Sequence, residues 1–312
     1  ATAQAVLMAG AVPVIANIDE NLGIDIDDAS SKVSDRTKAI IPVHMDGLSA
    51  DLDGVKRLAN QQNLVVIEDV AQALGGEFGG KRLGTHGDFG CFSLNENKNL
   101  TSGEGGILIT NDQCAYKKAK LFHDGPSLFG PTNQEFYSDI EPFMGRSMRV
   151  SEISGSIMRV QLSRLDEILG ALKQRKNAVL KTLRGDSYEV IYGADPEGDC
   201  CSSLHLRFHD IQRARDCGKK LRDRNIIFYP ITARPAHACW QWMHLLGDNA
   251  NIDDRQNPYK LTNKKYVYHK AMYLQSMHVA SAVLKLDLDI HKPVEYYSDM
   301  GKQIGQIINQ EN

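Results

Sequence analysis

The sequence is poor in aromatic residues, has no long hydrophobic run and carries almost no net charge. Aromatic residues make up 7% of its 312 residues, and only two of them are tryptophans. No apolar run approaches the ~20 residues of a membrane-spanning helix, so we expect no membrane segment. The 36 Lys and Arg residues against 39 Asp and Glu residues leave a net charge of −3. Because nucleic acid and anionic lipid surfaces select basic proteins, neither is an expected partner.

The cysteines show no pairing pattern. None of the six belongs to a C-x-x-C motif, and Cys200 and Cys201 are too close for an ordinary disulfide. We therefore expect neither a zinc site nor a disulfide framework, and a reducing cytoplasm fits this composition. Residues 1–4 contain neither a methionine nor a basic stretch before an apolar one, so we expect no signal peptide here and interpret this start as the middle of a longer chain.

What is present is an ordinary globular composition, with 42% hydrophobic and 24% charged residues. The first half alternates short β-branched runs with a helical pattern over residues 51–63, which begins at Asp51. Runs this short, bounded by Gly, Asp and Asn, suit strands buried on both faces. They span residues 12–16, 39–43, 64–67 and 105–110. The alternation predicts an α/β fold with a mostly parallel sheet.

The second half begins with a long helical pattern. From residue 151 to about 183 the apolar spacing predicts one uninterrupted helix. Its stripe comprises Ile153, Ile157, Val160, Leu162, Leu165, Ile168, Leu169 and Leu172. Beyond it we expect a smaller α+β domain, with strands over 188–192 and 203–208, a helix over 211–224 and a last helix within 289–309.

Candidate reactive residues lie close together between residues 68 and 106. Glu68 and Asp69 end a predicted strand, where ligands bind in open α/β sheets. Alternatively, they only cap a following helix. Three glycines over residues 84–90 predict tight turns before Ser93, which ends the next strand and could bind phosphate. Lys98 follows this strand and precedes the Gly-rich residues 101–106; its alternative interpretation is an ordinary surface lysine.

In this order, these features resemble the DegT/DnrJ/EryC1/StrS family of sugar aminotransferases, which have the aspartate-aminotransferase fold (fold type I) and use pyridoxal phosphate (PLP). The resemblance covers nearly the whole chain. It rests on residues 9–13, 36–44, 68–73, 87–93 with Lys98 five residues later, 103–106, 148–152 and 161–166. It implies a PLP-binding large domain over 1–170, incomplete at its N-terminus, and a small C-terminal domain over 171–312.

The resemblance gives each matched residue a role. Lys98 would be the Schiff-base lysine, whose amine must be neutral to attack an aldehyde and can then move protons. Asp69 would keep the pyridine nitrogen protonated. Gln72 resembles the residue beside the ring hydroxyl, and Ser93 the hydroxyl that binds the phosphate. Ser147 stands where the family has an Asn that reaches the neighbouring subunit's phosphate; it is shorter but can still donate a hydrogen bond.

The family's N-terminal segment, with its Ser-Gly-Thr phosphate cup and ring-stacking aromatic, has no counterpart here. If the chain starts at Ala1, half of the cofactor site is missing. The resemblance also implies a homodimer, because the family builds its sites between two subunits.

Within the family, the second half most resembles the branch that acts on 8-amino-3,8-dideoxyoctulosonate. The matching stretches are 195–199, 228–229, His237, Trp242 and His244. His237 and Trp242 would then face the sugar; alternatively, Trp240 and Trp242 are core or interface aromatics. His205 and His209 lie in a predicted strand without a third ligand, so no metal site is expected.

The leading hypothesis is transfer of an amino group from an amino acid, glutamate by family resemblance, to a keto or aldehyde sugar. One alternative is a cofactor-poor remnant that serves as a binding or regulatory subunit. Another is a PLP-dependent sugar dehydratase, in which histidine replaces the lysine; Lys98 opposes this. A nicotinamide enzyme is not expected, because residues 75–80 lack the G-x-G-x-x-G spacing.

Overall fold

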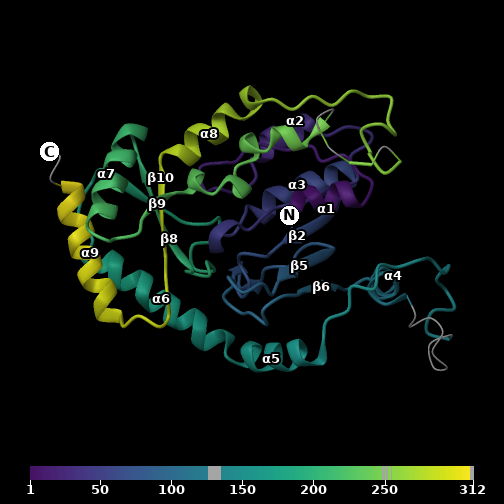
Figure 1. The fold of residues 1–312 in the computed structure, drawn as a ribbon, viewed down its shortest axis with the longest axis horizontal. Helices are drawn as coiled ribbons and strands as arrows, with labels where there is room; N and C mark the ends of the chain where they lie inside the picture. Colours follow the sequence, from purple (N-terminus) through teal and green to yellow (C-terminus); the bar gives the residue numbers. More distant parts are fainter. Residues whose placement is uncertain (126–134, 248–249, 251, 254, 310–312) are drawn as a thin grey trace.

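The computed structural model describes residues 1–125, 135–247, 250, 252–253 and 255–309, without the side chain of His244. Two β-sheets lie next to each other, each with its own helices (Figure 1). The larger domain carries the N-terminal half of the chain, and the smaller one carries most of the rest.

The sheet of the larger domain, called the large sheet below, has the strand order β1-β2-β5-β6. Its strands are β1 (Ala39–Ile40), β2 (Val65–Asp69), β5 (Phe89–Ser93) and β6 (Gly106–Thr110). The pairs β1–β2 and β2–β5 are parallel, whereas β6 joins β5 antiparallel. The mostly parallel sheet predicted from the sequence is present, with an antiparallel strand at one edge. A hairpin of β3 (Glu77–Phe78) and β4 (Lys81–Arg82) follows β2.

Aspartate side chains begin three of the four helices in this half. The helices are α1 (Thr2–Met8), α2 (Ile26–Lys32), α3 (Leu52–Gln62) and α4 (Gln113–His123). The Asp51 carboxylate accepts a hydrogen bond from the Gly54 N–H, and Asn63 ends α3 in a left-handed conformation. The helix predicted over 51–63 is therefore confirmed; its buried Leu52, Val55 and Leu58 show why the spacing identified it.

The strand predicted over residues 12–16 does not form. Pro13 has no N–H to donate, and its carbonyl accepts a hydrogen bond from the Tyr268 hydroxyl at 2.5 Å. The Ile15 carbonyl accepts from the Lys32 ammonium at 3.0 Å. Side chains thus satisfy these backbone carbonyls, and an apolar run of strand length remains irregular.

The helix predicted over 151–183 breaks at Arg164 into α5 (Glu152–Ser163) and α6 (Leu165–Thr182). The two halves differ in burial. In α6, Ile168, Leu172 and Val179 are buried in the main core. In α5, Ile153 and Val160 are 74% and 61% exposed. The prediction of one uninterrupted helix is wrong. The exposure of α5 also shows that apolar spacing indicates a possible apolar face of a helix and does not show that another element covers it.

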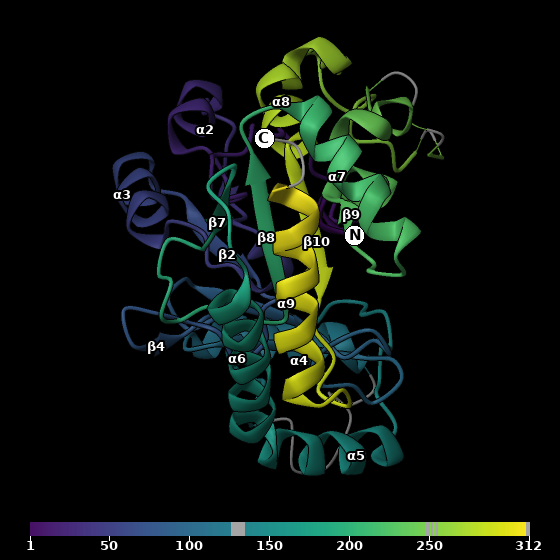
Figure 2. The same cartoon turned by 90° about the vertical axis from the view of Figure 1, so that its left-hand side faces the viewer.

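The sheet of the smaller domain, called the small sheet below, is antiparallel, with the order β7-β8-β10-β9. Its strands are β7 (Tyr188–Ile191), β8 (Ser203–Phe208), β9 (Tyr229–Pro230) and β10 (Val283–Asp287). Helices α7 (Ile211–Asp223), α8 (Leu274–Ser281) and α9 (Val294–Asn309) accompany them, and α9 lies alongside β8 and β10 (Figure 2). The strands and helices predicted beyond residue 187 are confirmed.

Short 3₁₀ turns connect these elements: η1 (Met45–Gly47), η3 (Ile231–Ala233), η4 (Pro235–His237), η5 (Cys239–Gln241), η6 (Met243–Leu245) and η8 (Lys270–Tyr273). The main core joins the small sheet, α6, α7 and α9 with Leu94 and Leu100 of the large domain. The division into domains at residue 170 falls within α6 and stays a prediction.

The glycines predicted to form tight turns include one at a very close backbone approach. A Cβ at Gly90, in β5, would lie 2.2 Å from the Gly84 carbonyl oxygen. Gly90→Ala is therefore expected to lower the free energy of unfolding by about 2 kcal/mol or more. Chemical denaturation checks this. Gly155→Ala in α5, where a Cβ meets nothing within 4 Å, is the control. It should raise stability by about 0.5–1 kcal/mol; equal effects at both positions would contradict the prediction.

Candidate active site

Asp69 lies at the carboxyl end of β2, in the interior of the large sheet. One carboxylate oxygen accepts a hydrogen bond from the Ala71 N–H at 3.1 Å, and the other accepts one from the Thr2 hydroxyl at 2.7 Å. These two donors from separate segments fix the carboxylate beyond the end of the strand. Turns follow β2, so the alternative that Asp69 and Glu68 cap a helix is wrong.

Glu68 has a different position and a structural role. It is fully buried, and its carboxylate accepts hydrogen bonds from the N–H groups of Gly84, His86 and Gly87, each at 2.7 Å. The His44 Nε2 lies 3.3 Å away. The His44 Nδ1 accepts from the Ala50 N–H, so Nε2 carries the hydrogen that points at Glu68. Burial opposes ionisation of Glu68, but His44 and the N–H groups outweigh it and lower the pKa to about 2.

Lys98 lies in the loop between β5 and β6. Leu94 and Leu100 anchor this loop in the main core, and the Lys98 N–H donates to the Asn95 carbonyl at 3.1 Å. The half-buried amine forms no ion pair or hydrogen bond with any side chain of the described residues. Burial lowers the pKa of Lys98, and of the charges that act on it Asp69 has the largest effect. The charge of Asp69 thus acts on Lys98, and the two residues follow or end the parallel neighbouring strands β5 and β2.

Gln72 follows β2 and Ser93 ends β5. The Gln72 carboxamide oxygen accepts a hydrogen bond from the Asp46 N–H at 3.2 Å. Ser93 ends β5, and its hydroxyl oxygen accepts from the Asn95 N–H at 3.4 Å. β2 and β5 are parallel neighbours, so the segments that follow their carboxyl ends meet at the same sheet edge.

Charged residues of the small domain complete the site. The Lys285 ammonium, on β10, pairs with Asp46 and lies 3.0 Å from an Asp287 carboxylate oxygen. Asp287 also accepts from the Tyr229 hydroxyl and from Arg234, the latter at 3.1 Å. Motif reasoning missed Asp46, Lys285 and Arg234, because they are distant in sequence and belong to no local pattern. For Asp46, a local signal that could have identified it is its position before Gly47, in a turn.

His205 of β8 is fully buried beneath this group. Its Nε2 lies 3.6 Å from an Asp46 carboxylate oxygen, and neither ring nitrogen has a hydrogen-bond partner. Burial lowers the pKa of His205, and Asp46 opposes this shift. Within the described part of the chain, no group of three or more His, Cys, Asp and Glu side chains could hold a metal ion.

The remaining predicted residues have different positions. His237 has an exposed side chain near the charged group: partial desolvation lowers its pKa, and the charges of Asp46, Arg234, Lys285 and Lys98 act on it. Trp242 packs in an apolar cluster with Met243, Leu246 and Tyr273, and its buried indole N–H has no partner among the described residues.

Ser147 is exposed, with a φ of 52°, in the segment before α5. The structure does not bring it to Lys98 within this subunit. The side chain of His244 lies outside the described residues.

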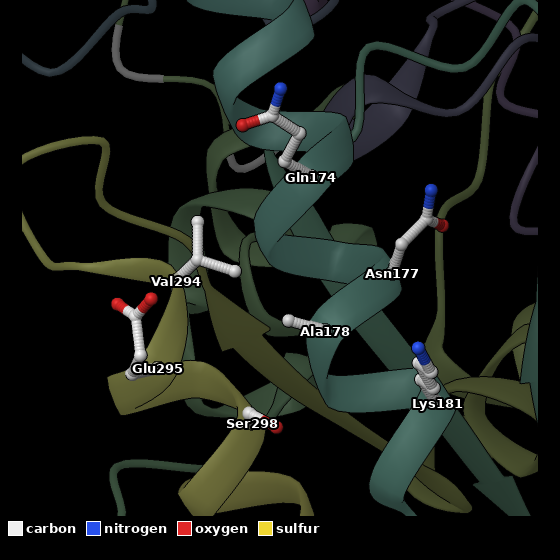
Figure 3. Close-up of a pocket in the computed structure, with 7 residues that line it drawn as sticks. All are labelled: Gln174, Asn177, Ala178, Lys181, Val294, Glu295 and Ser298. Carbon is white, nitrogen blue, oxygen red and sulfur yellow. The ribbon is translucent and has the colours of Figure 1, made fainter.

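The two described surface grooves do not contain Lys98. One, of about 460 Å³, lies between α6 and α9, and five of its seven lining residues have polar side chains (Figure 3). It contains none of the predicted residues. A second, of about 320 Å³, includes Tyr229 and Asp287 and so borders the charged group. No described helix is long and apolar enough to cross a bilayer.

Glu68 gives a pH-dependent prediction. Its pKa is depressed from 4.5 to about 2, so the ionised carboxylate stabilises the fold fully above pH 4.5 and progressively less as the pH falls towards 2. Glu68→Gln should lower the free energy of unfolding at pH 7 by about 2–4 kcal/mol. It should also flatten the pH dependence between 4.5 and 2. Urea denaturation across this range measures both, with exposed Glu104→Gln as the control; an unchanged slope in Glu68→Gln would refute the role.

Comparison with known proteins identifies a family that this chain matches. The model of the DegT/DnrJ/EryC1/StrS aminotransferase family matches residues 1–246. A UDP-N-acetyl-3-dehydro-alpha-D-glucosamine 3-aminotransferase of Acidithiobacillus ferrooxidans is 38% identical over 167 residues, which are 53% of this chain and 43% of that protein. GDP-perosamine synthase of Escherichia coli O157:H7 is 33% identical over 246 residues, covering 76% and 65%.

A solved structure has the same fold. The E. coli GDP-4-keto-6-deoxy-D-mannose-3-dehydratase with bound hydrated PLP superposes with a TM-score of 0.73 at 18% identity, over 97% of this chain and 76% of that one. The fold and family predicted from the sequence are confirmed. The chain spans about half the length of the curated relatives it matches.

Proposed function

The chain belongs to the DegT/DnrJ/EryC1/StrS aminotransferase family, and on this basis we propose that it is a PLP-dependent aminotransferase that moves an amino group from an amino acid to a keto or aldehyde sugar. One observation carries this proposal. The half-buried amine of Lys98, which has no side-chain partner among the described residues, follows β5, and the charge of Asp69 at the end of the parallel neighbour β2 acts on it.

The residues present fit the ring end of PLP. A bound PLP supplies an electron sink for the carbanion that forms when the substrate loses a proton. Lys98 would hold the cofactor covalently through its amine and, once released, would carry a proton at this nitrogen, since partial burial makes the amine easier to deprotonate. Asp69 holds a proton at the pyridine nitrogen, and the hydrogen bonds from Thr2 and Ala71 orient its carboxylate.

Three further residues take the remaining polar groups of the cofactor in this proposal. Gln72 lies beside the ring hydroxyl, with its carboxamide fixed by the Asp46 N–H. Ser93 donates its hydroxyl hydrogen to the phosphate. Ser147 reaches the phosphate of a neighbouring subunit, for which its exposed position before α5 leaves it available.

The proposal extends to the substrates. Several relatives are named as aminotransferases or amino-sugar synthases, which supports a sugar acceptor. We assign glutamate as the amino donor and a 3,8-dideoxyoctulosonate-type sugar as the acceptor. His237 and Trp242 are the proposed sugar contacts; the position of His237 near Lys98 supports its role more directly than the apolar surroundings of Trp242 do.

A cytoplasmic homodimer is part of the same proposal. All six cysteines are free thiols, which fits a reducing compartment. The exposed apolar side chains of α5, Ile153, Ile157, Val160 and Leu162, are of the kind that a second subunit covers.

The cofactor proposal has a direct spectroscopic test. Purified protein mixed with PLP should gain a near-visible absorbance band that borohydride fixes covalently, and Lys98→Ala should lose it. Lys302→Ala, which removes an exposed amine on α9, is the control and should retain the band. Added glutamate should then convert the band to that of the pyridoxamine form.

The outcomes separate the alternatives. If the wild-type protein forms no band, a cofactor-poor binding or regulatory subunit is the correct interpretation. If the band forms and glutamate never converts it, the aminotransferase proposal is wrong although the site exists. Release of ammonia and a deoxygenated sugar, in place of an amino sugar, would identify a dehydratase.

The proposed sugar contact predicts a selective kinetic defect. His237→Gln should raise the KM for the acceptor sugar about tenfold, the effect of one lost hydrogen bond, and leave the conversion by glutamate unchanged. Steady-state and half-reaction kinetics measure the two effects separately. His291→Gln, at an exposed histidine, should change neither. An equal loss in both half-reactions would assign His237 to the cofactor site instead.

A further inference from the structure

Asp46 connects the two domains beneath the candidate site. It lies in the turn η1 of the large domain, only 8% exposed, and its carboxylate pairs with Lys285 of the small sheet. Lys285 is itself 3% exposed, so this pair is buried. A buried pair of this kind is costly to break, because each charge left alone lacks the solvation of water.

The backbone of Asp46 is bound on both sides as well. Its carbonyl accepts hydrogen bonds from the hydroxyls of Ser202 and Ser203 at 3.1 and 3.2 Å. Its N–H donates to the Gln72 carboxamide oxygen. The φ of 53° is a left-handed conformation that Asp and Asn adopt more readily than most residues. Asp46 therefore transmits the position of the small sheet to Gln72.

We propose that the Asp46–Lys285 ion pair is a positioning element of the cofactor site: it holds Gln72 in place and balances the charge felt by Lys98. This inference rests on the proposed function. In this proposal neither Asp46 nor Lys285 contacts the cofactor. Both act by positioning Gln72 and through the electrostatic effect of their charges on Lys98.

The charged surroundings determine the sign of the effect. Asp69 and Asp46 favour a positive charge on Lys98, whereas Arg234 and Lys285 oppose it. His205 faces Asp46 from β8, His237 lies near the same group, and Asp287 and Tyr229 border Lys285 from the solvent side. Loss of Asp46 and loss of Lys285 should thus move the protonation of the Lys98 nitrogen in opposite directions.

The test is the pH titration of the absorbance band that PLP forms with Lys98. Asp46→Asn keeps the shape and the left-handed preference but removes the negative charge. The midpoint of the titration should fall by about 0.5–1 pH unit, the size expected for a nearby charge that acts through an effective dielectric constant of 20 or more. Lys285→Met should raise it by a similar amount, and the double variant should return close to the wild-type value.

Asp287→Asn is the matched control. It removes a carboxylate from the same lysine, but Asp287 is half-exposed and has no contact with Gln72. Its shift should be clearly smaller than that of Asp46→Asn. Thermal unfolding identifies variants that do not fold. If Asp46→Asn does not fold, the upward shift of the titration midpoint in Lys285→Met tests the inference by itself.

Two results overturn the inference. Midpoints that do not move, or that move in the same direction in Asp46→Asn and Lys285→Met, show that the pair has only a structural role. An Asp287→Asn shift as large as that of Asp46→Asn shows that the effect is not specific to the buried pair. A wild-type protein without a band overturns the proposed function as well, and so is distinguishable from both.

Discussion

The organisation of the site depends on the partial burial of one amine next to one carboxylate. Lys98 and Asp69 follow or end two parallel neighbouring strands, so the sheet itself brings them together. Removing the Lys98 amine from water favours its neutral, nucleophilic form, while Asp69 limits this effect. The rest of the site adjusts this balance: Thr2 orients Asp69, Glu68 holds the neighbouring loop, and the small domain contributes its own charges.

Local sequence signals predicted much of the fold. The Asp51 cap, the alternation around β2 and the helical spacing in α6 and α7 are short-range properties that depend little on the rest of the chain. The wrong predictions have one physical cause: whether an apolar segment is buried depends on the other segments that pack against it. The run at residues 12–16 has apolar side chains but satisfies its backbone through Tyr268 and Lys32, and the apolar face of α5 is exposed.

The same distinction applies to the site. Lys98, Asp69, Gln72 and Ser93 lie within 30 positions of one another in the sequence, and an ordered motif could identify them. Asp46 and Lys285 are 239 positions apart, and each by itself resembles an ordinary charged residue. Only the packing of β10 against η1 reveals their pairing. Nearly every polar group of Asp46 has a partner, which no property of the isolated sequence segment indicates.

The central claim is that Lys98 is the amine to which the cofactor binds. The most direct measurement is peptide mapping by mass spectrometry after the protein has been treated with PLP and borohydride. We predict that the added pyridoxyl mass occurs, in about one equivalent, on the peptide that contains Lys98. Modification of a different lysine, or a low level of modification spread over many surface lysines, would contradict the claim.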